Sequence, residues 1–170
     1  MPTKKPPSKR NAKPKLVLTR DFAAPRALVF AAWTESAHLK QWSAPHGFKI
    51  PVSEGDLCLG GAWRAVMVMP DGMKLGLGGV YQKVIPNTLL VFTHRWEGPE
   101  AGPETLVTVR FSDAPGGGTR IKFEQTGFAS AASRDGHSGG WNECFERLDA
   151  LLLKLKQTAD VRKRPARSLK

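Results

Sequence analysis

The chain has 170 residues, enough for one domain with a substantial core, and carries a formal net charge of +11. That charge lies at the ends: residues 1–15 contain six Lys or Arg and residues 161–170 contain five, with no acid in either segment. The fifteen remaining basic residues equal the fifteen acids in number, so the body of the chain lacks the excess charge typical of a nucleic-acid-binding domain.

Two features indicate the cellular compartment. The sequence has no signal-peptide core and no apolar run near the ~20 residues that span a membrane. Its two cysteines, Cys58 and Cys144, are isolated, which is typical of free thiols in a reducing compartment. We therefore expect a soluble, cytoplasmic protein without a transmembrane segment.

The terminal segments, 1–15 and 159–170, are rich in Pro, Lys and Arg and poor in large apolar residues. Such segments cannot bury enough surface to offset the entropy of ordering, so we expect two disordered basic tails around a single domain at 16–158. The tails either make weak, salt-sensitive contacts with nucleic acid or an anionic membrane, or only keep the protein soluble. Their composition favours the second role.

The start of the domain predicts a strand followed by two short helices. An alternating apolar strand ends at Asp21, and Pro25 suits the first turn of a helix because it has no N–H to satisfy. Apolar residues then recur at helical spacing from Leu28 to Trp33, and a second short helix ends at Trp42.

The middle of the chain predicts an antiparallel meander. Apolar and polar residues alternate in segments separated by turn sequences such as Pro70-Asp71-Gly72. The predicted strands are 48–57, 63–69, 74–85, 88–96, 105–111 and 119–126. Glycines inside these strands, as at Gly78 and Gly79, indicate bends, which a strongly curved sheet requires.

The last predicted element is a long amphipathic helix over 139–156. Its apolar residues recur every three or four positions, at Trp141, Phe145, Leu148, Leu152 and Leu155. The sheet is the only large apolar surface on which it can lie. A long helix on a curved sheet leaves room for a cavity between the two.

Five segments resemble the SRPBCC (START-like) superfamily and, within it, the C-terminal domain of activators of heat-shock protein 90 ATPase. They are APRALVFAAWTESAHLKQW, PDGMKLGLGGVYQKVIPNTLLVFTHRW, TLVTVRF, GGGTRIKFEQTGF and RDGHSGGWNECFERLDALL. The resemblance implies an α+β helix-grip fold, in which a curved antiparallel sheet of about six or seven strands wraps a long C-terminal helix, with two short helices after the first strand. This fold serves lipid carriers, polyketide cyclases, hormone receptors and co-chaperones, so it does not specify an activity.

Strand parity and the helical stripe select ten candidate lining residues for the cavity: Trp63, Met67, Tyr81, Phe92, His94, Trp96, Val109, Phe123, Trp141 and Phe145. Tyr81 and His94 are the candidate polar contacts. His94 has two interpretations, because both faces of its strand are apolar in part: a rim or surface histidine near the strand end, which we favour, or a polar group inside an apolar pocket. His137 either helps to bind an anionic head group beside Trp141 or belongs to the start of the helix, and the second is favoured.

We expect the domain to bind a small hydrophobic or amphipathic molecule, such as a lipid, an aromatic compound or a polyketide-like compound. The alternatives are a cyclase or dehydratase that uses the same cavity and a co-chaperone-like or tail-mediated interaction module. The pattern indicates no catalytic residue, no cofactor and no metal site, because the four histidines are dispersed and the Gly-rich runs lead into strands. Whether the protein is a monomer or a dimer is not specified.

Overall fold

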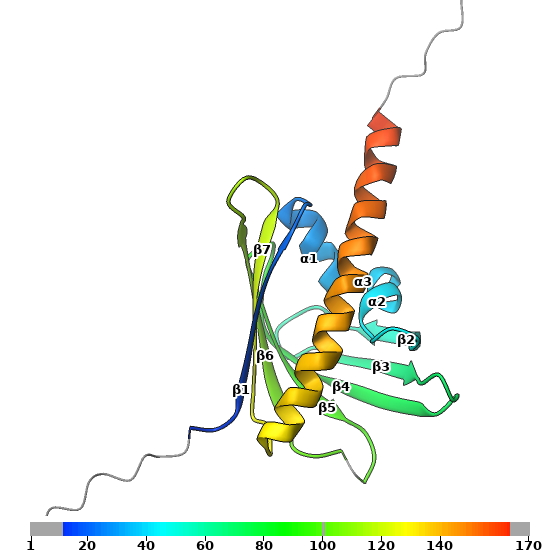
Figure 1. Cartoon of the computed structure of the whole chain (residues 1–170), viewed down its shortest axis with the longest axis vertical. Helices are drawn as coiled ribbons and strands as arrows, with labels where there is room; N and C mark the ends of the chain where they lie inside the picture. Colours follow the sequence, from blue (N-terminus) through cyan, green and yellow to red (C-terminus); the bar gives the residue numbers. More distant parts are fainter. Residues whose placement is uncertain (1–11, 100, 164–170) are drawn as a thin grey trace, which may run out of the picture.

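The computed structural model describes residues 12–99 and 101–163, and within them it shows seven strands and three helices (Figure 1). The strands are β1 (Lys15–Phe22), β2 (Lys49–Gly55), β3 (Ala62–Val68), β4 (Lys74–Ile85), β5 (Leu89–Trp96), β6 (Thr105–Asp113) and β7 (Thr119–Thr126). The helices are α1 (Arg26–Thr34), α2 (Ser36–Trp42) and α3 (Ala131–Lys163). The expected helix-grip architecture, with two short helices after the first strand, is confirmed.

The strands form one antiparallel sheet in the order β1-β7-β6-β5-β4-β3-β2. Strands β2 to β7 follow the chain as a meander, whereas β1 pairs with β7 at the far edge. The connection from β1 to β2 must therefore cross the whole sheet, and α1 and α2 lie along this crossing on the same side of the sheet as α3 (Figure 1). Register shifts within the β2–β3 and β4–β5 pairs add to the bending of the sheet.

Gly79 shows why a strand of this sheet contains glycine. A Cβ at this position would collide with the backbone carbonyl of Thr93 and with the indole of Trp63. The bare backbone of Gly79 lets the Trp63 side chain reach across β4, where its Nε1 donates a hydrogen bond to the Thr93 carbonyl at 3.1 Å.

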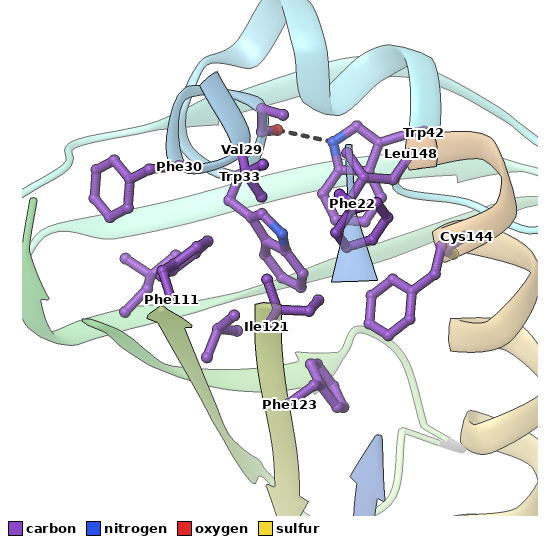
Figure 2. Packing of buried hydrophobic residues seen from close by; sticks show 14 of the residues in the cluster. Phe22, Val29, Phe30, Trp33, Trp42, Phe111, Ile121, Phe123, Cys144 and Leu148 are labelled. Atoms are coloured by element: carbon purple, nitrogen blue, oxygen red, sulfur yellow. Dashed lines mark hydrogen bonds between the residues drawn. The ribbon is translucent and has the colours of Figure 1, made fainter. Parts of the chain in front are cut away.

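The larger of two hydrophobic clusters fills the space between β1, β5, β6, β7 and the helices α1 and α3. Figure 2 shows Trp33 pointing from α1 toward Ile121 and Phe123 of β7. Beside it, Trp42 Nε1 donates to the Ala32 carbonyl at 2.8 Å, which fixes α2 against α1. This cluster anchors α3 to one half of the sheet.

A smaller cluster lies over the other half of the sheet. It consists of Ala44, Ile50, Ala65, Met67 and Leu77, from β2, β3, β4 and the segment after α2. Trp63 packs against both clusters. The two clusters do not merge, and the candidate site lies between them.

Helix α3 is longer than the sequence analysis predicted. It begins at Ala131, not near 139, because Ser130 acts as an N-cap whose Oγ accepts a hydrogen bond from the Ser133 N–H at 3.1 Å. The low helix propensity of Gly136, Gly139 and Gly140 concealed these first turns in the sequence pattern.

The helix also continues through 159–163, a segment that we expected to be part of a disordered tail. The remainder of the predicted tails, 1–11 and 164–170, lies outside the described residues. In the described part of the chain, no helix combines the length and the apolar character needed to cross a membrane.

Candidate functional site: a cavity between sheet and helix

A cavity of about 530 Å³ lies between β2–β5 on one side and α2 and α3 on the other. Strand β5 contributes the inward-facing row Leu90, Phe92, His94 and Trp96. The opposite wall is the first half of α3, which contributes Ser133, Gly136, His137, Gly140, Trp141 and Cys144. Among the described residues no Asp, Glu, Lys or Arg lines this space, so its surface is uncharged.

His94 lies within the cavity wall and is only 5% exposed. Its ring is surrounded by aromatic rings, with centroids at 5.5 Å for Trp96, 5.9 Å for Trp63, 6.0 Å for His137 and 6.4 Å for Trp141. The expectation of a rim or surface histidine is therefore wrong. Strand parity could not show this, because the start of α3, which covers the end of β5, was not predicted.

Burial, together with a smaller effect of the neighbouring His137, lowers the pKa of His94 from 6.5 to about 4. The imidazole is therefore neutral at pH 7. Apart from an interaction with its own backbone, no described residue forms a hydrogen bond with either ring nitrogen. If one ring nitrogen carries the N–H that interacts with the His94 backbone, the other nitrogen has a lone pair with no partner among the described residues.

His137, in contrast, has both ring nitrogens occupied. Its Nδ1 lies 2.8 Å from the Ser133 carbonyl, and its Nε2 accepts a hydrogen bond from Trp96 Nε1 at 3.2 Å. These partners assign the neutral Nδ1–H tautomer. His137 therefore connects the end of β5 to α3, and its hydrogen-bonding groups are not free for another partner.

A buried hydrogen-bond chain fixes the wall around His94. Trp141 Nε1 donates to Gln125 Oε1 at 2.8 Å, and Gln125 Nε2 donates to Thr105 Oγ1 at 2.8 Å. The Thr105 hydroxyl then donates to the His94 carbonyl at 3.1 Å. Because the indole N–H groups of Trp63, Trp96 and Trp141 are all used within the protein, these side chains offer only their aromatic rings to the cavity.

The chemistry of the lining argues against a nucleophile. Burial raises the pKa of the Cys144 thiol to about 12, so the thiolate needed for attack is absent at pH 7. Burial also raises the pKa of the Tyr81 hydroxyl, which stays protonated, and no described residue forms a hydrogen bond with it. Tyr81 and His94 are thus the two buried polar groups of the sheet wall that are left for a ligand.

Comparison with known proteins identifies the family. Residues 23–153 match the family described as Activator of Hsp90 ATPase homolog 1-like protein, over most of the chain. The chain belongs to this family. No curated protein matches the sequence.

Several solved structures share the fold of this chain. A protein from Chromobacterium violaceum is 25% identical, with a TM-score of 0.76 over 81% of this chain and 96% of that one. A protein from Nitrosomonas europaea is 26% identical, with a TM-score of 0.74 over 86% and 99%. The AHSA1 protein from Silicibacter pomeroyi is 27% identical, with a TM-score of 0.74 over 84% and 99%. The fold of this family is known for ligand-binding cavities.

Seven of the ten candidate residues line the cavity of this family member: Trp63, Met67, Tyr81, Phe92, His94, Trp96 and Trp141. The other three, Val109, Phe123 and Phe145, are fully buried in the larger cluster and do not line it. Strand parity and the helical stripe place them on inward faces, but α1 and α3 cover this face of the sheet over β6 and β7. The ring centroids of Phe123 on β7 and Trp141 on α3, for example, are 4.6 Å apart. Within the described sheet, the cavity borders only the half formed by β2–β5.

The segment that closes the cavity beside α2 has no signal in the sequence pattern. Ser43, Pro45 and Phe48 line the cavity from this segment. Arg147 of α3 holds it, because Nη1 donates to the carbonyls of Ala44 at 2.6 Å and Pro45 at 3.1 Å. No local pattern indicates this role, since Arg147 appears in the sequence as one of several charged residues of an amphipathic helix.

Glycines in the α3 wall were also missed. Gly136 and Gly140 line the cavity, and neither has a positive φ. Each glycine within a helix costs about 1 kcal/mol relative to alanine. A repeated glycine at a spacing of four on one helix face is the signal that could have shown this wall.

Proposed function

We propose that the protein binds a small, uncharged and largely apolar molecule in the cavity between β2–β5 and α3. The observation that carries the proposal is an apolar cavity of about 530 Å³ whose described lining contains no charged side chain but does contain the buried, neutral His94. Ligand sites in proteins have volumes of roughly 300–1,000 Å³ and a few placed polar groups, so the size and composition agree.

Binding would be driven by transfer of the apolar ligand surface out of water. The aromatic rings of Trp63, Trp96 and Trp141 would cover the ligand, and His94 and Tyr81 would fix its orientation through hydrogen bonds. An ionised ligand would lose its hydration without gaining an oppositely charged partner, which disfavours fatty acids and other anions bound by their charged group.

Native mass spectrometry of gently purified protein, followed by organic extraction, tests this function. We expect a discrete adduct that disappears on denaturation. A cavity-filling variant, Ala65→Phe, should fold and lose the adduct, because Ala65 lines the cavity. Its neighbour Val66 does not line the cavity, so Val66→Phe is the matched control and should keep the adduct. An adduct that survives in Ala65→Phe would contradict the proposed site.

A cyclase or dehydratase is the second candidate, because His94 is a titratable group buried beside the ligand space. A base with a pKa of about 4 is weak at pH 7, where an efficient general base has a pKa near the working pH. The lowered pKa therefore favours an orienting role. Incubation of the extracted compound with fresh protein separates the two: a product of changed mass would support turnover, and unchanged ligand would support binding alone.

A further inference from the structure

The cavity wall formed by α3 contains glycine where alanine would fit. A Cβ added at Gly136 would meet no heavy atom within 4 Å, and one at Gly140 would meet only Pro45 Cγ, at an ordinary distance of 3.8 Å. A close approach by another part of the chain therefore does not explain the glycine at either position. Both lie on the face of α3 that lines the cavity, where their missing side chains leave the helix backbone open.

An independent feature points into the same space. His94 is 95% buried, lines the cavity and has no hydrogen-bond partner among the other described residues. Its ring lies 6.0 Å from that of His137 and 6.4 Å from that of Trp141, the two α3 residues next to the glycines in sequence. A molecule lying on the glycine wall would thus share the cavity with the His94 ring, whose free nitrogen can accept a hydrogen bond.

The neighbouring groups define the shape and polarity of that molecule. Trp63, Trp96 and Trp141 present rings without free N–H groups, which suits a flat aromatic surface. Both ring nitrogens of His137, the nearest group on α3, are already hydrogen-bonded, and no charged side chain lines the cavity within the described residues. A hydroxyl group meets these conditions, because it can donate to the lone pair of His94 without carrying charge.

We propose that the ligand is a flat, uncharged aromatic compound with a hydroxyl group, that Gly136 and Gly140 keep the α3 wall free for its ring, and that His94 accepts the hydrogen bond of its hydroxyl. This inference rests on the proposed function and specifies the class of ligand.

Three probes of one size test the ligand class: 2-naphthol, 2-methylnaphthalene and the anion 2-naphthoate. Binding is measured at pH 7 by quenching of tryptophan fluorescence and by calorimetry. We expect 2-naphthol to bind about fivefold more tightly than 2-methylnaphthalene, the value of one ordinary hydrogen bond. 2-Naphthoate should bind most weakly, because its charge has no partner in the cavity.

The glycine wall is tested with Gly136→Ala and Gly140→Ala, and Gly139→Ala is the matched control. Gly139 lies on the same helix with no heavy atom within 4 Å of an added Cβ, but it does not line the cavity. All three substitutions should raise Tm by about 2–4 °C, because alanine replaces glycine in a helix. Only the first two should weaken 2-naphthol binding, by about tenfold or more, since one methyl group occupies ligand space.

The role of His94 is tested with His94→Phe and His94→Gln. In His94→Phe the preference for 2-naphthol over 2-methylnaphthalene should disappear, while 2-methylnaphthalene still binds. His94→Gln keeps an acceptor oxygen and should retain part of the preference. It also provides a second folded variant if phenylalanine does not fit.

The outcomes separate this inference from the function on which it rests. If none of the probes binds and no adduct is found on the purified protein, the cavity is not a ligand site and both proposals fail. If the probes bind without preference for the hydroxyl compound, or if Gly136→Ala and Gly140→Ala bind it as well as Gly139→Ala does, the ligand class and the glycine wall are wrong while the binding function stands.

Discussion

Trp96 Nε1 donates a hydrogen bond to His137 Nε2 across 3.2 Å, and this contact joins the last residue of β5 to the second turn of α3. His137 completes the link through its Nδ1, which lies 2.8 Å from the Ser133 carbonyl. The pair forms one side of the cavity and holds the neutral His137 ring beside His94. This bond between two aromatic side chains therefore fixes the β5 wall of the cavity against the α3 wall.

A double-mutant cycle measures this link. Trp96→Phe and His137→Phe each remove one partner, and we expect a coupling energy of about 1 kcal/mol, the usual net value of a hydrogen bond. Urea unfolding of the wild type, both single variants and the double variant provides the four free energies. Additive free energies would show that the contact does not contribute to stability.

Trp33 and Trp42 provide a matched comparison of a free and a bonded indole. Both are almost fully buried, but Trp33 Nε1 has no hydrogen-bond partner within 12–99 and 101–163, whereas Trp42 Nε1 donates to the Ala32 carbonyl at 2.8 Å. Replacement by phenylalanine removes similar volume at both sites, and at Trp33 it also removes an unpaired buried donor. We expect Trp42→Phe to lower the free energy of unfolding by about 1 kcal/mol more than Trp33→Phe. Equal losses in urea titrations would indicate that the Trp33 N–H is satisfied in solution.

Stability should fall in mild acid because of His94. Its pKa is about 4 in the folded protein and 6.5 for the ordinary side chain, so between these values the unfolded state binds more protons. Above pH 6.5 the ring is neutral in both the folded and the unfolded state, so it does not make stability depend on pH. As the pH falls from 6.5 to 4, the unfolded state gains a proton that the folded state does not bind, and the free energy of unfolding falls by about 3 kcal/mol in total. Urea unfolding at pH 7 and pH 5 measures this loss.

His94→Phe is the control for the pH effect. The variant keeps the other histidines, and its stability should depend much less on pH between 7 and 5. If the wild type and the variant lose the same stability over this interval, the proton uptake belongs to other groups.

Arg147 should hold the segment that closes the cavity beside α2. Arg147→Met removes the donor for the carbonyls of Ala44 and Pro45, so we expect a loss of about 1.5–3 kcal/mol in the free energy of unfolding. Hydrogen exchange within 43–48 should become faster in the variant. Lys154→Met, on an exposed part of α3, is the control and should change neither property.

The prediction of the fold succeeded where the signal is local. Alternation over 105–111 and 119–126 marked strands that the structure confirms, since successive side chains of a strand point to opposite faces whatever lies beyond them. The start of α3 could not be predicted in this way, because Gly136, Gly139 and Gly140 remove the apolar pattern just where the helix lines a cavity and has nothing to pack against.

Alone, the sequence determined which residues share a face of a strand and, through their order and spacing, the helix-grip fold. Only the tertiary structure decided which inward-facing residues meet other side chains and which face open space. Phe123 and His94 both lie on inward faces, yet α1 and α3 cover the first tightly and leave a cavity over the second. The reason is physical: parity is fixed by the backbone of each strand, whereas burial, the lowered pKa of His94 and the open glycine wall depend on the element that long-range packing places opposite.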